Sequence, residues 1–362
     1  MTTLTMLSPS NENELAEILR GATGRLAIRG SATRHYPQEG TPLTTHAISG
    51  VQLYEPGALT LVARAGTPIT EIDALLAQNN QRLPFEPMDH RPLLHTTGEP
   101  TIGGMIGLNH CGPRRLQVGS ARDLLLGLRL VDGTGRIIKN GGRVMKNVTG
   151  YDLARLNCGA RGGLGIITEV CLKVLPMPEA TTTLALPETD PEQAVRTMAA
   201  ALGSPYEVTG AAWDGATVLL RVEGFAQSVH YRTSRLAHLL PSAVSIEGNP
   251  WPAIRDCLRF ADQKTDVWRV SLRASQGGLA ARRLRDKGID VQLDWGGALL
   301  WASTTSGTDL RMLLGRGYGH ATLLRGKPGP TTPELEPQSA PVAMLSEQLR
   351  RSFDPRDLFR RS

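Results

Sequence analysis

The stretch Thr101-Ile102-Gly103-Gly104-Met105-Ile106-Gly107 decides how the N-terminal half of this chain folds. It lies within residues 96–122, where glycine recurs at positions 98, 103, 104, 107, 112 and 119. Glycine has no Cβ atom, so its backbone approaches a ligand closely and adopts positive φ. The adjacent glycines therefore allow a flat ligand or a diphosphate to lie against the main chain, and a tight packing corner is the alternative. The glycine density predicts a wrapped loop system that is too irregular for a helix.

A second glycine-bearing segment, Arg29-Gly30-Ser31-Ala32-Thr33-Arg34, precedes this stretch. A short apolar strand is expected at residues 25–30, followed by an exposed, turn-rich loop over residues 31–45. Backbone N–H groups and two hydroxyls would converge where the strand ends and could cradle a pyrophosphate, although an ordinary surface turn has the same composition. The chain has neither a G-x-G-x-x-G motif after a strand nor a G-x-x-x-x-G-K-[ST] motif, which excludes the Rossmann and P-loop interpretations.

Outward from these segments, the pattern predicts an α+β protein of two domains. In the first domain we expect a helix at 12–21, a strand at 58–65, a helix at 70–78 and strands at 124–131, 136–139 and 165–175. Asp132-Gly133-Thr134-Gly135 is expected to form a hairpin turn between the strands at 124–131 and 136–139. Two closely spaced prolines, Pro176 and Pro178, end this block. Beyond them, strands are expected at 181–186, 206–213, 217–223, 268–273, 297–303 and 320–325, with helices at 191–202, 227–240, 252–260, 279–287 and 308–314. No internal sequence repeat is evident, and a structural duplication of the second domain stays open.

The domain boundaries follow from this pattern. Residues 1–178 form the first domain, residues 179–325 a smaller α+β cap, and residues 326–362 a proline-rich linker and a final helix near 343–351. The chain has 362 residues, of which 40% are hydrophobic and 20% charged, with a net charge of +6. These values exclude a disulfide-stapled peptide and a low-complexity chain, and with no block of like charges we expect no nucleic-acid partner.

The four cysteines, Cys111, Cys158, Cys171 and Cys257, never occur as Cys-x-x-Cys, so we expect no metal site in this chain. The first residues lack a basic region followed by an apolar one, and no stretch reaches the roughly 18 apolar residues of a membrane span. The sequence therefore predicts a cytoplasmic protein, with peripheral attachment to the inner face of the cell membrane left open.

Several motifs together resemble one family. They are Thr101–Gly104, Gly112-Pro113-Arg114-Arg115, Gly119-Ser120-Ala121-Arg122-Asp123, residues 141–152 (GGRVMKNVTGYD) and Leu164–Val170. The pattern resembles the FAD-binding E subunits of bacterial glycolate oxidase, which are flavoproteins with the vanillyl-alcohol-oxidase, or PCMH-type, FAD domain. The resemblance is dense from about residue 25 to residue 178, and residues 146–152 are its most specific part. It implies a two-part PCMH-type FAD domain with an inserted cap and a C-terminal helix that returns to the FAD domain.

The resemblance also implies which residues hold FAD. Two loops, Gly30, Ser31, Ala32, Thr33 and Thr101, Ile102, Gly103, Gly104, would clasp the pyrophosphate. Gly119, Ser120 and Asp123 would support the same cofactor, and main chain near Gly162 and Ile167 would face its adenosine end. Several aligned N–H donors suit a dianionic pyrophosphate without charged side chains.

Two departures from the family pattern stand out. The first loop usually reads Arg-Gly-Gly-Gly-Ser-Lys, whereas here two glycine positions carry Ser31 and Ala32. The tail motif Phe353–Phe359 is followed by Arg360-Arg361-Ser362 in place of Asn-Pro-Gly-Arg. The first departure affects the loop at the pyrophosphate, and the second removes contacts expected near the flavin.

By resemblance, the chain is one subunit of a complex that oxidises glycolate to glyoxylate, with a second FAD-binding subunit and an iron–sulfur subunit as partners. A self-sufficient dehydrogenase of a small 2-hydroxy acid and a flavin-free scaffold are the alternatives. No catalytic residue is assigned. The side chains considered are His320 at a helix end, His110 in the glycine-rich loops, and His35, which in some relatives links covalently to flavin. Arg114 and Arg115, or Arg269 and Arg273 on one side of a strand, could receive an anion or form structural contacts.

Overall fold

The computed structural model describes residues 6–34, 39–143, 150–315 and 317–359. The chain divides into two compact units, of which unit 1 comprises residues 1–111, 119–177 and 338–362, and unit 2 comprises residues 112–118 and 178–337. The segment 112–118 therefore belongs to unit 2 although both of its sequence neighbours belong to unit 1. Among the described residues, no helix is both long and apolar enough to cross a bilayer.

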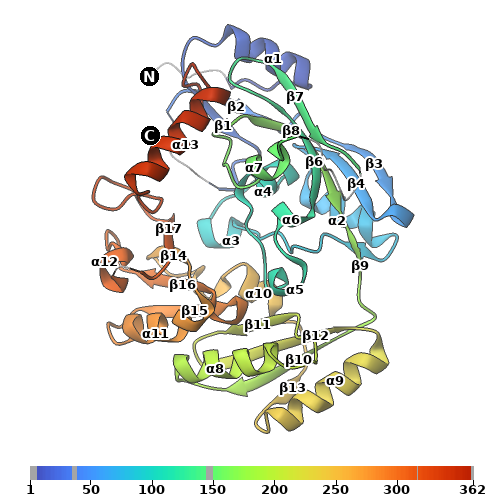
Figure 1. Cartoon of the computed structure of the whole chain (residues 1–362), viewed down its shortest axis with the longest axis vertical. Helices are drawn as coiled ribbons and strands as arrows, with labels where there is room; N and C mark the ends of the chain where they lie inside the picture. The colour runs from blue at the N-terminus through green and yellow to red at the C-terminus, as the bar shows by residue number, and fades with distance from the viewer. Residues whose placement is uncertain (1–5, 35–38, 144–149, 316, 360–362) are drawn as a thin grey trace. The chain divides into compact units, whose positions relative to one another are not determined.

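Unit 1 is built on a five-stranded antiparallel sheet in the order β3-β4-β8-β6-β7 (Figure 1). The strands are β3 (Val51–Glu55), β4 (Thr60–Arg64), β6 (Leu125–Val131), β7 (Ile137–Gly141) and β8 (Ile166–Lys173). A parallel pair, β1 (Leu26–Arg29) and β2 (Thr41–Thr44), and an antiparallel pair, β5 (Gln81–Arg82) and β9 (Leu175–Pro176), complete the strands of this unit. The helices are α1 (Glu12–Gly21), α2 (Ile69–Ala77), α3 (Arg91–Leu94), α4 (Ile102–Leu108), α6 (Ala121–Leu124), α7 (Leu153–Asn157) and α13 (Ala340–Phe353), with a 3-10 turn η1 (Pro56–Ala58).

The five-stranded sheet separates two apolar cores. Successive side chains of a strand point to opposite faces, so Leu130 and Ile167 join the core that contains α2 and α4. Their neighbours Val131 and Ile166 pack on the other side, in the core of α1 and the C-terminal residues. The predicted turn between β6 and β7 is confirmed, because the Asp132 carboxylate accepts hydrogen bonds from backbone N–H groups inside the turn. The sheet thus holds α4 on one face and the end of the chain on the other.

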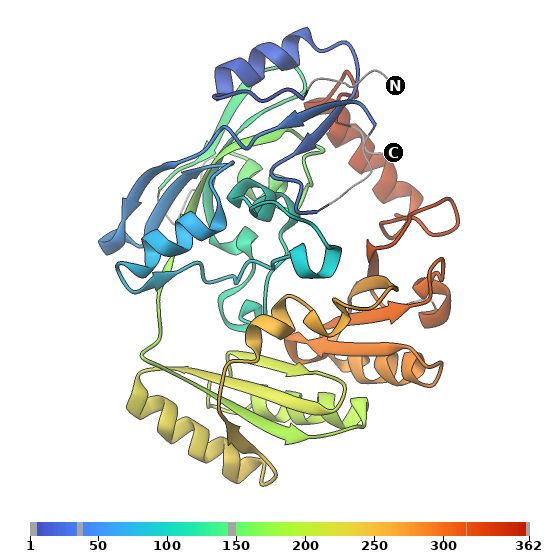
Figure 2. The ribbon, with the colours of Figure 1, turned by 180° about the vertical axis from the view of Figure 1, so that it is seen from behind.

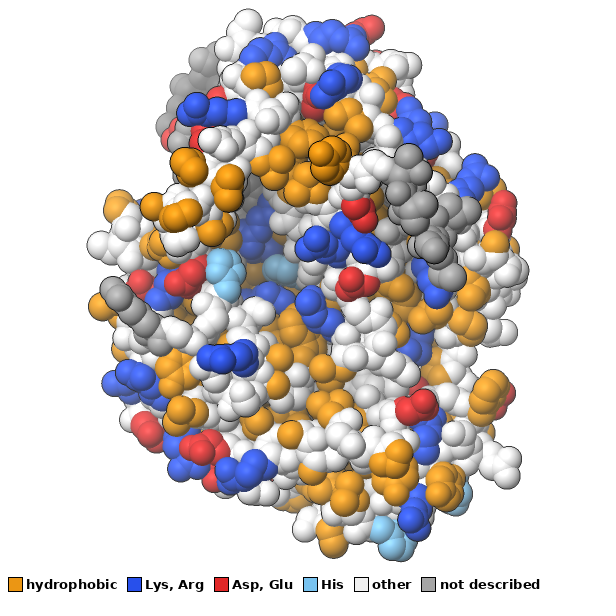
Figure 3. Space-filling model, in the orientation of Figure 1, with side chains coloured by type: hydrophobic (Ala, Val, Ile, Leu, Met, Phe, Trp, Pro, Cys, Tyr) orange, Lys and Arg blue, Asp and Glu red, His pale blue; other side chains and the backbone are white. Residues whose placement is uncertain are grey.

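The C-terminal segment returns to unit 1, as the resemblance implies. The backbone N–H of Gly133 donates to the Phe353 carbonyl, and the Asp354 carboxylate accepts from the N–H groups of Leu358 and Phe359. Helix α13 itself has no buried residue, and Figure 3 shows apolar side chains on its surface. The residues after the helix, rather than the helix, anchor this segment.

Unit 2 is an eight-stranded antiparallel sheet in the order β13-β10-β12-β11-β15-β16-β14-β17. Its strands are β10 (Ala180–Pro187), β11 (Gly210–Trp213), β12 (Thr217–Gly224), β13 (Val244–Ile246), β14 (Asp266–Ser271), β15 (Asp290–Asp294), β16 (Leu299–Thr304) and β17 (His320–Arg325). Its helices are α5 (Arg115–Val118), α8 (Pro191–Leu202), α9 (Ala226–Leu239), α10 (Trp251–Arg255), α11 (Ala274–Arg285) and α12 (Leu310–Leu314), with 3-10 turns η2 (Leu258–Phe260) and η3 (Trp295–Gly297). Figures 1 and 2 show α8 and α11 together against this sheet.

The order of elements reveals the duplication that the sequence left open. The pattern β-α-β-β-α-β occurs first from β10 to β13 and again from β14 to β17. Each half has the strand order of a split β-α-β fold, and the halves meet where β11 pairs with β15. The repeat is structural because both halves need the same alternation of strand and helix, which many different apolar side chains can satisfy.

Candidate functional site

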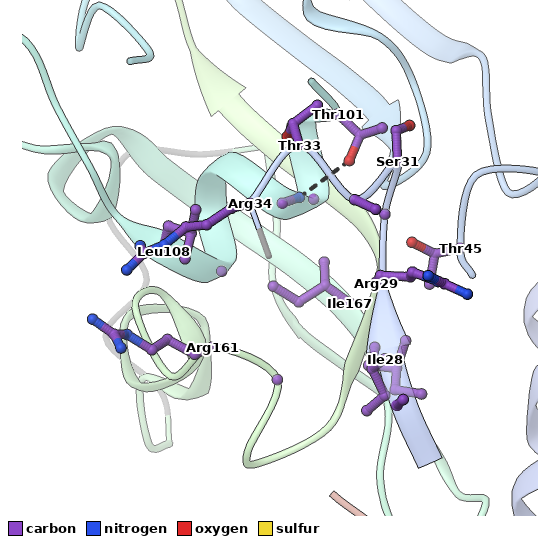
Figure 4. Close-up of a pocket in the computed structure, with 18 of the residues that line it drawn as sticks. Ile28, Arg29, Ser31, Thr33, Arg34, Thr45, Thr101, Leu108, Arg161 and Ile167 are labelled. Atoms are coloured by element: carbon purple, nitrogen blue, oxygen red, sulfur yellow. Dashed lines mark hydrogen bonds between the residues drawn. The ribbon is translucent and has the colours of Figure 1, made fainter. Parts of the chain in front are cut away.

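A cavity of about 370 Å³ lies in unit 1 beside the end of β1 (Figure 4). Three separate parts of the chain form most of its wall: residues 27–34, residues 101–108 of α4 with its N-cap, and residues 161–167 before β8. Gly30 and Thr101 approach so closely that a Cβ atom on Gly30 would lie 2.6 Å from the Thr101 hydroxyl oxygen. A side chain at position 30 would therefore separate the two loops.

Most of the residues expected to hold the cofactor line this cavity. They are Gly30, Ser31, Ala32, Thr33, Thr101, Gly103, Gly104, Gly162 and Ile167. Ile102 instead points into the apolar core of unit 1. Gly119, Ser120 and Asp123 are not among the described residues that line the cavity. The Asp123 carboxylate instead accepts hydrogen bonds of 2.8 Å from the Ser120 N–H and hydroxyl, which cap α6. The two loops, which lie some seventy residues apart in sequence, do come together.

The glycine-rich stretch differs from the expected loop system, since residues 102–108 form helix α4. The Thr101 hydroxyl oxygen accepts from the Gly104 N–H at the start of this helix, and Asn109 ends it in the left-handed region. Gly103 is required because α4 crosses the end of β4 closely: a Cβ atom there would lie 2.6 Å from the Ala65 Cβ. The prediction of an irregular loop is wrong here because tight packing, rather than turn geometry, explains this glycine. The expected exposed loop over residues 31–45 likewise contains β2.

The donor set of the cavity fits a diphosphate. Within the described part of the chain, the N–H groups of Ser31, Ala32 and Thr33 donate to no backbone carbonyl. The loop that carries them is fixed, because the Thr96 hydroxyl donates to the Thr33 carbonyl over 2.7 Å. Arg34 and Arg161 also line the cavity, and Figure 4 shows both on the side of Leu108. Amides and guanidinium groups are the donors that phosphate oxygens prefer.

The sequence reasoning assigned no role to the three arginines of this wall, Arg29, Arg34 and Arg161. A signal for Arg34 was available, since the family loop ends in lysine at this position. The sequence held no such signal for Arg161. Its position depends on a turn in which Arg161 and Gly162 have φ values of +56° and +80°, and only the structure shows that turn. The sequence analysis therefore missed positively charged side chains of the cavity wall and not its backbone segments.

Ala32 shows how the altered first loop keeps its shape. Its φ is +56°, in the left-handed region that favours glycine, and this is one of the two positions where the family has glycine. An L-residue with a Cβ atom loses about 1–2 kcal/mol in that region. The loop therefore retains a glycine-type conformation in spite of the substitution.

Replacing Ala32 by glycine is therefore expected to raise the free energy of unfolding. The strain relieved, about 1–2 kcal/mol, exceeds the entropy gained by the unfolded chain, about 0.4–1 kcal/mol, so a net gain of up to about 1.6 kcal/mol is expected. Ala58, an exposed residue at the end of the helical turn η1, provides the control, because Ala58→Gly should lower stability. Urea unfolding of both variants checks this, and equal losses would contradict it.

The candidate histidines occupy different environments. His110 follows α4 and is buried against His90 and Arg34. His320 is exposed as the first residue of β17, not at the end of a helix as expected. His35 lies outside the described residues, as do residues 146–149 of the most specific motif and residues 360–362 of the tail. Of that motif, Asp152 is described and caps α7 by accepting from the Arg155 N–H.

The candidate arginines take structural positions in unit 2. Arg114 donates to Glu223 over 2.5 Å in a buried pair. The guanidinium carbons of Arg115 and Arg269 lie 4.6 and 5.2 Å from the centre of the Trp295 ring. Arg273 lies beyond the end of β14, at the N-cap of α11, so the expected pairing with Arg269 on one strand face is wrong. The strand ends two residues earlier than the sequence suggested.

All four cysteines are buried free thiols. Burial raises the pKa of Cys158 to about 12 and that of Cys171 to about 11, which keeps both protonated at neutral pH. In the described ranges, no three histidine, cysteine or acidic side chains gather as metal ligands.

Comparison with known proteins identifies the fold and the family. A model of an FAD binding domain matches residues 4–141, and FAD is the cofactor of this chain. The solved structure of alkyldihydroxyacetonephosphate synthase superposes with a TM-score of 0.68 over 98% of this chain and 75% of that chain, at 16% identity. The α+β, PCMH-type fold expected from the sequence is thereby confirmed.

Curated relatives give closer matches. The chain is 34% identical over 186 residues to the glycolate oxidase subunit GlcD of Bacillus subtilis, covering 49% of this chain and 38% of that protein. With the D-lactate dehydrogenase of Archaeoglobus fulgidus it shares 29% identity over 190 residues, 50% of this chain and 41% of the relative. With the glycolate oxidase subunit GlcE of Escherichia coli it shares 34% identity over 339 residues, which is 92% of this chain and 91% of that subunit. The chain therefore belongs to the GlcE family of FAD-binding oxidoreductase subunits.

Proposed function

We propose that this chain is the FAD-binding subunit of a glycolate oxidase, or dehydrogenase, complex that converts glycolate to glyoxylate. The observation that carries the proposal is the cavity of unit 1. Its wall joins the N–H groups of Ser31, Ala32 and Thr33, which donate to no backbone carbonyl, with the glycines at the start of α4 and with arginine side chains. The match to GlcE over nearly the whole chain supports the substrate. We further propose a cytoplasmic location, attached at most peripherally to the membrane.

The residues assigned to FAD follow from their places in the cavity wall. Gly30–Thr33 and Thr101–Gly104 clasp the pyrophosphate, with Ile102 acting through the core beneath α4. Main chain at Gly162 and Ile167 faces the adenosine. Gly119, Ser120 and Asp123 support the cofactor indirectly, because their capping box fixes α6, which packs against α7.

In this proposal the chain itself binds FAD and relays electrons. Oxidation of glycolate to glyoxylate removes two electrons and two protons, and bound FAD supplies a two-electron acceptor. A base and a cation for the carboxylate are also required. The family resemblance implies that a histidine-bearing Asp-Gly-Asp-Gly-Asn-type segment of the second FAD-binding subunit helps to form that site, and this sequence has no such segment. We therefore assign substrate oxidation to that second FAD-binding subunit and onward transfer to an iron–sulfur subunit.

An absorption spectrum of the purified chain tests the assignment first. We expect a yellow preparation, or one that becomes yellow on addition of FAD and keeps the colour through gel filtration. A colourless chain that refuses FAD would instead favour the flavin-free scaffold.

Anaerobic addition of glycolate then tests the division of labour. The flavin of the isolated chain should stay oxidised, whereas the flavins of the assembled complex should bleach. Full glycolate turnover by the isolated chain with an artificial acceptor would show a self-sufficient dehydrogenase and refute the relay role.

A further inference from the structure

Two threonine side chains hold the carbonyl oxygens at the ends of the first loop of the cavity. The Thr44 hydroxyl donates to the Gly30 carbonyl over 2.8 Å, and the Thr96 hydroxyl donates to the Thr33 carbonyl over 2.7 Å. Thr44 is the last residue of β2, whereas Thr96 follows α3, so two separate parts of unit 1 hold the loop. We call Thr44 and Thr96 the hydroxyl clamp.

The middle of the loop also contacts residues outside the cavity wall. The Ser31 carbonyl lies against Gly98, where a Cβ atom would come within 2.3 Å of its oxygen. The Ser31 hydroxyl lies 3.1 Å from Nδ1 of His46. Among the described residues that line the cavity, neither these two neighbours nor the hydroxyl clamp occurs. The loop therefore directs these oxygen atoms away from the cavity.

The held carbonyls fix the direction of the loop amides. The C=O and the N–H of one trans peptide unit point in opposite directions. Because the Gly30 carbonyl points to Thr44, the N–H of Ser31 points the other way. The Ser31 carbonyl against Gly98 directs the N–H of Ala32 likewise. Both N–H groups belong to the cavity wall, and in the described ranges neither donates to a backbone carbonyl, so they face the position of an anion.

The hydroxyl clamp opposes the strain of this loop. Ala32 has a φ of +56°, which a residue with a Cβ atom adopts only at a cost in free energy. Rotation of a peptide unit would relieve that strain but would turn a carbonyl oxygen toward the cavity. A carbonyl only accepts hydrogen bonds, so it would repel the oxygens of a diphosphate. Such a rotation at either end of the loop must first break a bond from Thr44 or Thr96.

We propose that Thr44 and Thr96 are positioning residues, which keep the first loop in the one conformation that presents its N–H groups to the diphosphate of the bound dinucleotide. The inference rests on the proposed function, because it requires FAD in the cavity of unit 1. It explains how the loop keeps its shape although Ser31 and Ala32 stand where the family has glycine.

Titration of the full-length chain with FAD, followed by flavin fluorescence, tests the proposal. Thr44→Val and Thr96→Val remove the hydroxyl donor, whereas Thr44→Ser and Thr96→Ser keep it. We expect each valine variant to raise the Kd about fivefold, which corresponds to one net hydrogen bond, and each serine variant to raise it less than about twofold. Wild-type affinity in both valine variants, or serine variants as weak as the valine variants, would overturn the proposal.

Glycine at position 32 separates a positioning role from a general loss of packing. The Thr44 hydroxyl also accepts from the His46 N–H over 3.2 Å, so Thr96→Val is the more selective background. Added to it, Ala32→Gly should lower the Kd at least about twofold, because glycine adopts φ +56° without the clamp. Absence of any recovery would contradict the link between the clamp and the strain.

ADP and a distant threonine complete the controls. ADP carries the diphosphate without the flavin, so its Kd, measured by displacement of FAD, should rise by the same factor in each valine variant. The Thr70 hydroxyl donates to Glu99 on the surface of α2, and Thr70→Val should leave both Kd values unchanged. A loss confined to FAD, or an equal loss in Thr70→Val, would overturn the inference while leaving the FAD site intact. A wild-type chain that takes up no FAD would defeat the proposed function itself.

Discussion

Replacing Glu223 by glutamine is expected to lower the free energy of unfolding of unit 2 by about 3–5 kcal/mol. Its Oε2 atom accepts from Arg114 over 2.5 Å and from the Thr209 hydroxyl over 2.7 Å, and it lies 3.3 Å from Nε of Arg221. The side chains of Arg114 and Glu223 are 6% and 5% exposed. Without the carboxylate, two buried guanidinium groups would lose the negative charge that Glu223 supplies to both of them.

Arg114→Met should lower the free energy of unfolding of unit 2 by less, about 1–3 kcal/mol, because Glu223 keeps Arg221 and Thr209 as donors. The control is Arg282→Met, which removes a pair of the same 2.5 Å length with Asp190 whose two side chains are 44% and 40% exposed. That substitution should cost less than about 1 kcal/mol, since water already solvates both charges.

Tryptophan fluorescence during urea unfolding reports these losses selectively. All five tryptophans lie in unit 2, namely Trp213, Trp251, Trp268, Trp295 and Trp301. The expected order of destabilisation is Glu223→Gln, then Arg114→Met, then Arg282→Met. Equal effects of the buried and exposed pairs would show that burial does not govern the strength of these contacts.

Gly103→Ala is expected to produce the second large effect, at the cofactor cavity. The added Cβ would lie 2.6 Å from the Ala65 Cβ and 2.9 Å from the Ala65 carbonyl oxygen, and a backbone atom cannot rotate away. Helix α4 must then shift from β4, which costs about 1–3 kcal/mol and moves Thr101 and Gly104 at the cavity wall. We expect an FAD affinity at least about tenfold lower, measured by fluorescence titration.

Gly107 in the same helix provides the matched control for stability. A Cβ atom there meets nothing within 4 Å, so Gly107→Ala should stabilise the cofactor-free chain by about 0.5–1 kcal/mol through helix propensity. Circular dichroism during thermal unfolding compares the two. If both alanine variants were equally stable, the close approach of α4 to β4 would not be what requires glycine at position 103.

The fold was predictable from the sequence where local pattern and burial agree. The alternation of residues 58–65 correctly predicted β4, and the Asp132–Gly135 turn correctly predicted the hairpin of β6 and β7. The helical pattern of residues 191–202 correctly predicted α8. The short strands β2, β3, β13 and β15 were not predicted, because each has only three to five residues, too few for a clear alternation. Of these, β13 pairs with the distant strand β10, whereas β3 and β15 pair with the strands that follow them, β4 and β16.

The cavity was predictable in its backbone and less so in its charges. Small residues at 30 and 103 indicated two loops that approach closely, which the structure confirms. The sequence could not show that glycine at 103 serves packing beneath a helix, since the same residue also suits a phosphate loop. Arg161 joins the cavity wall only because its segment lies against loops that are far away from it in the chain.

The short segment 112–118 has a consequence for how this protein can be taken apart or recombined. It supplies unit 2 with Arg114 and with the Gly112 carbonyl that accepts from the Trp295 indole over 3.0 Å. A gene fragment spanning only residues 178–337 would express a sheet stripped of those anchors. Grafting unit 2 onto another flavoprotein would require both segments, 112–118 and 178–337, to be transferred together, so unit 2 cannot be exchanged as one continuous insertion.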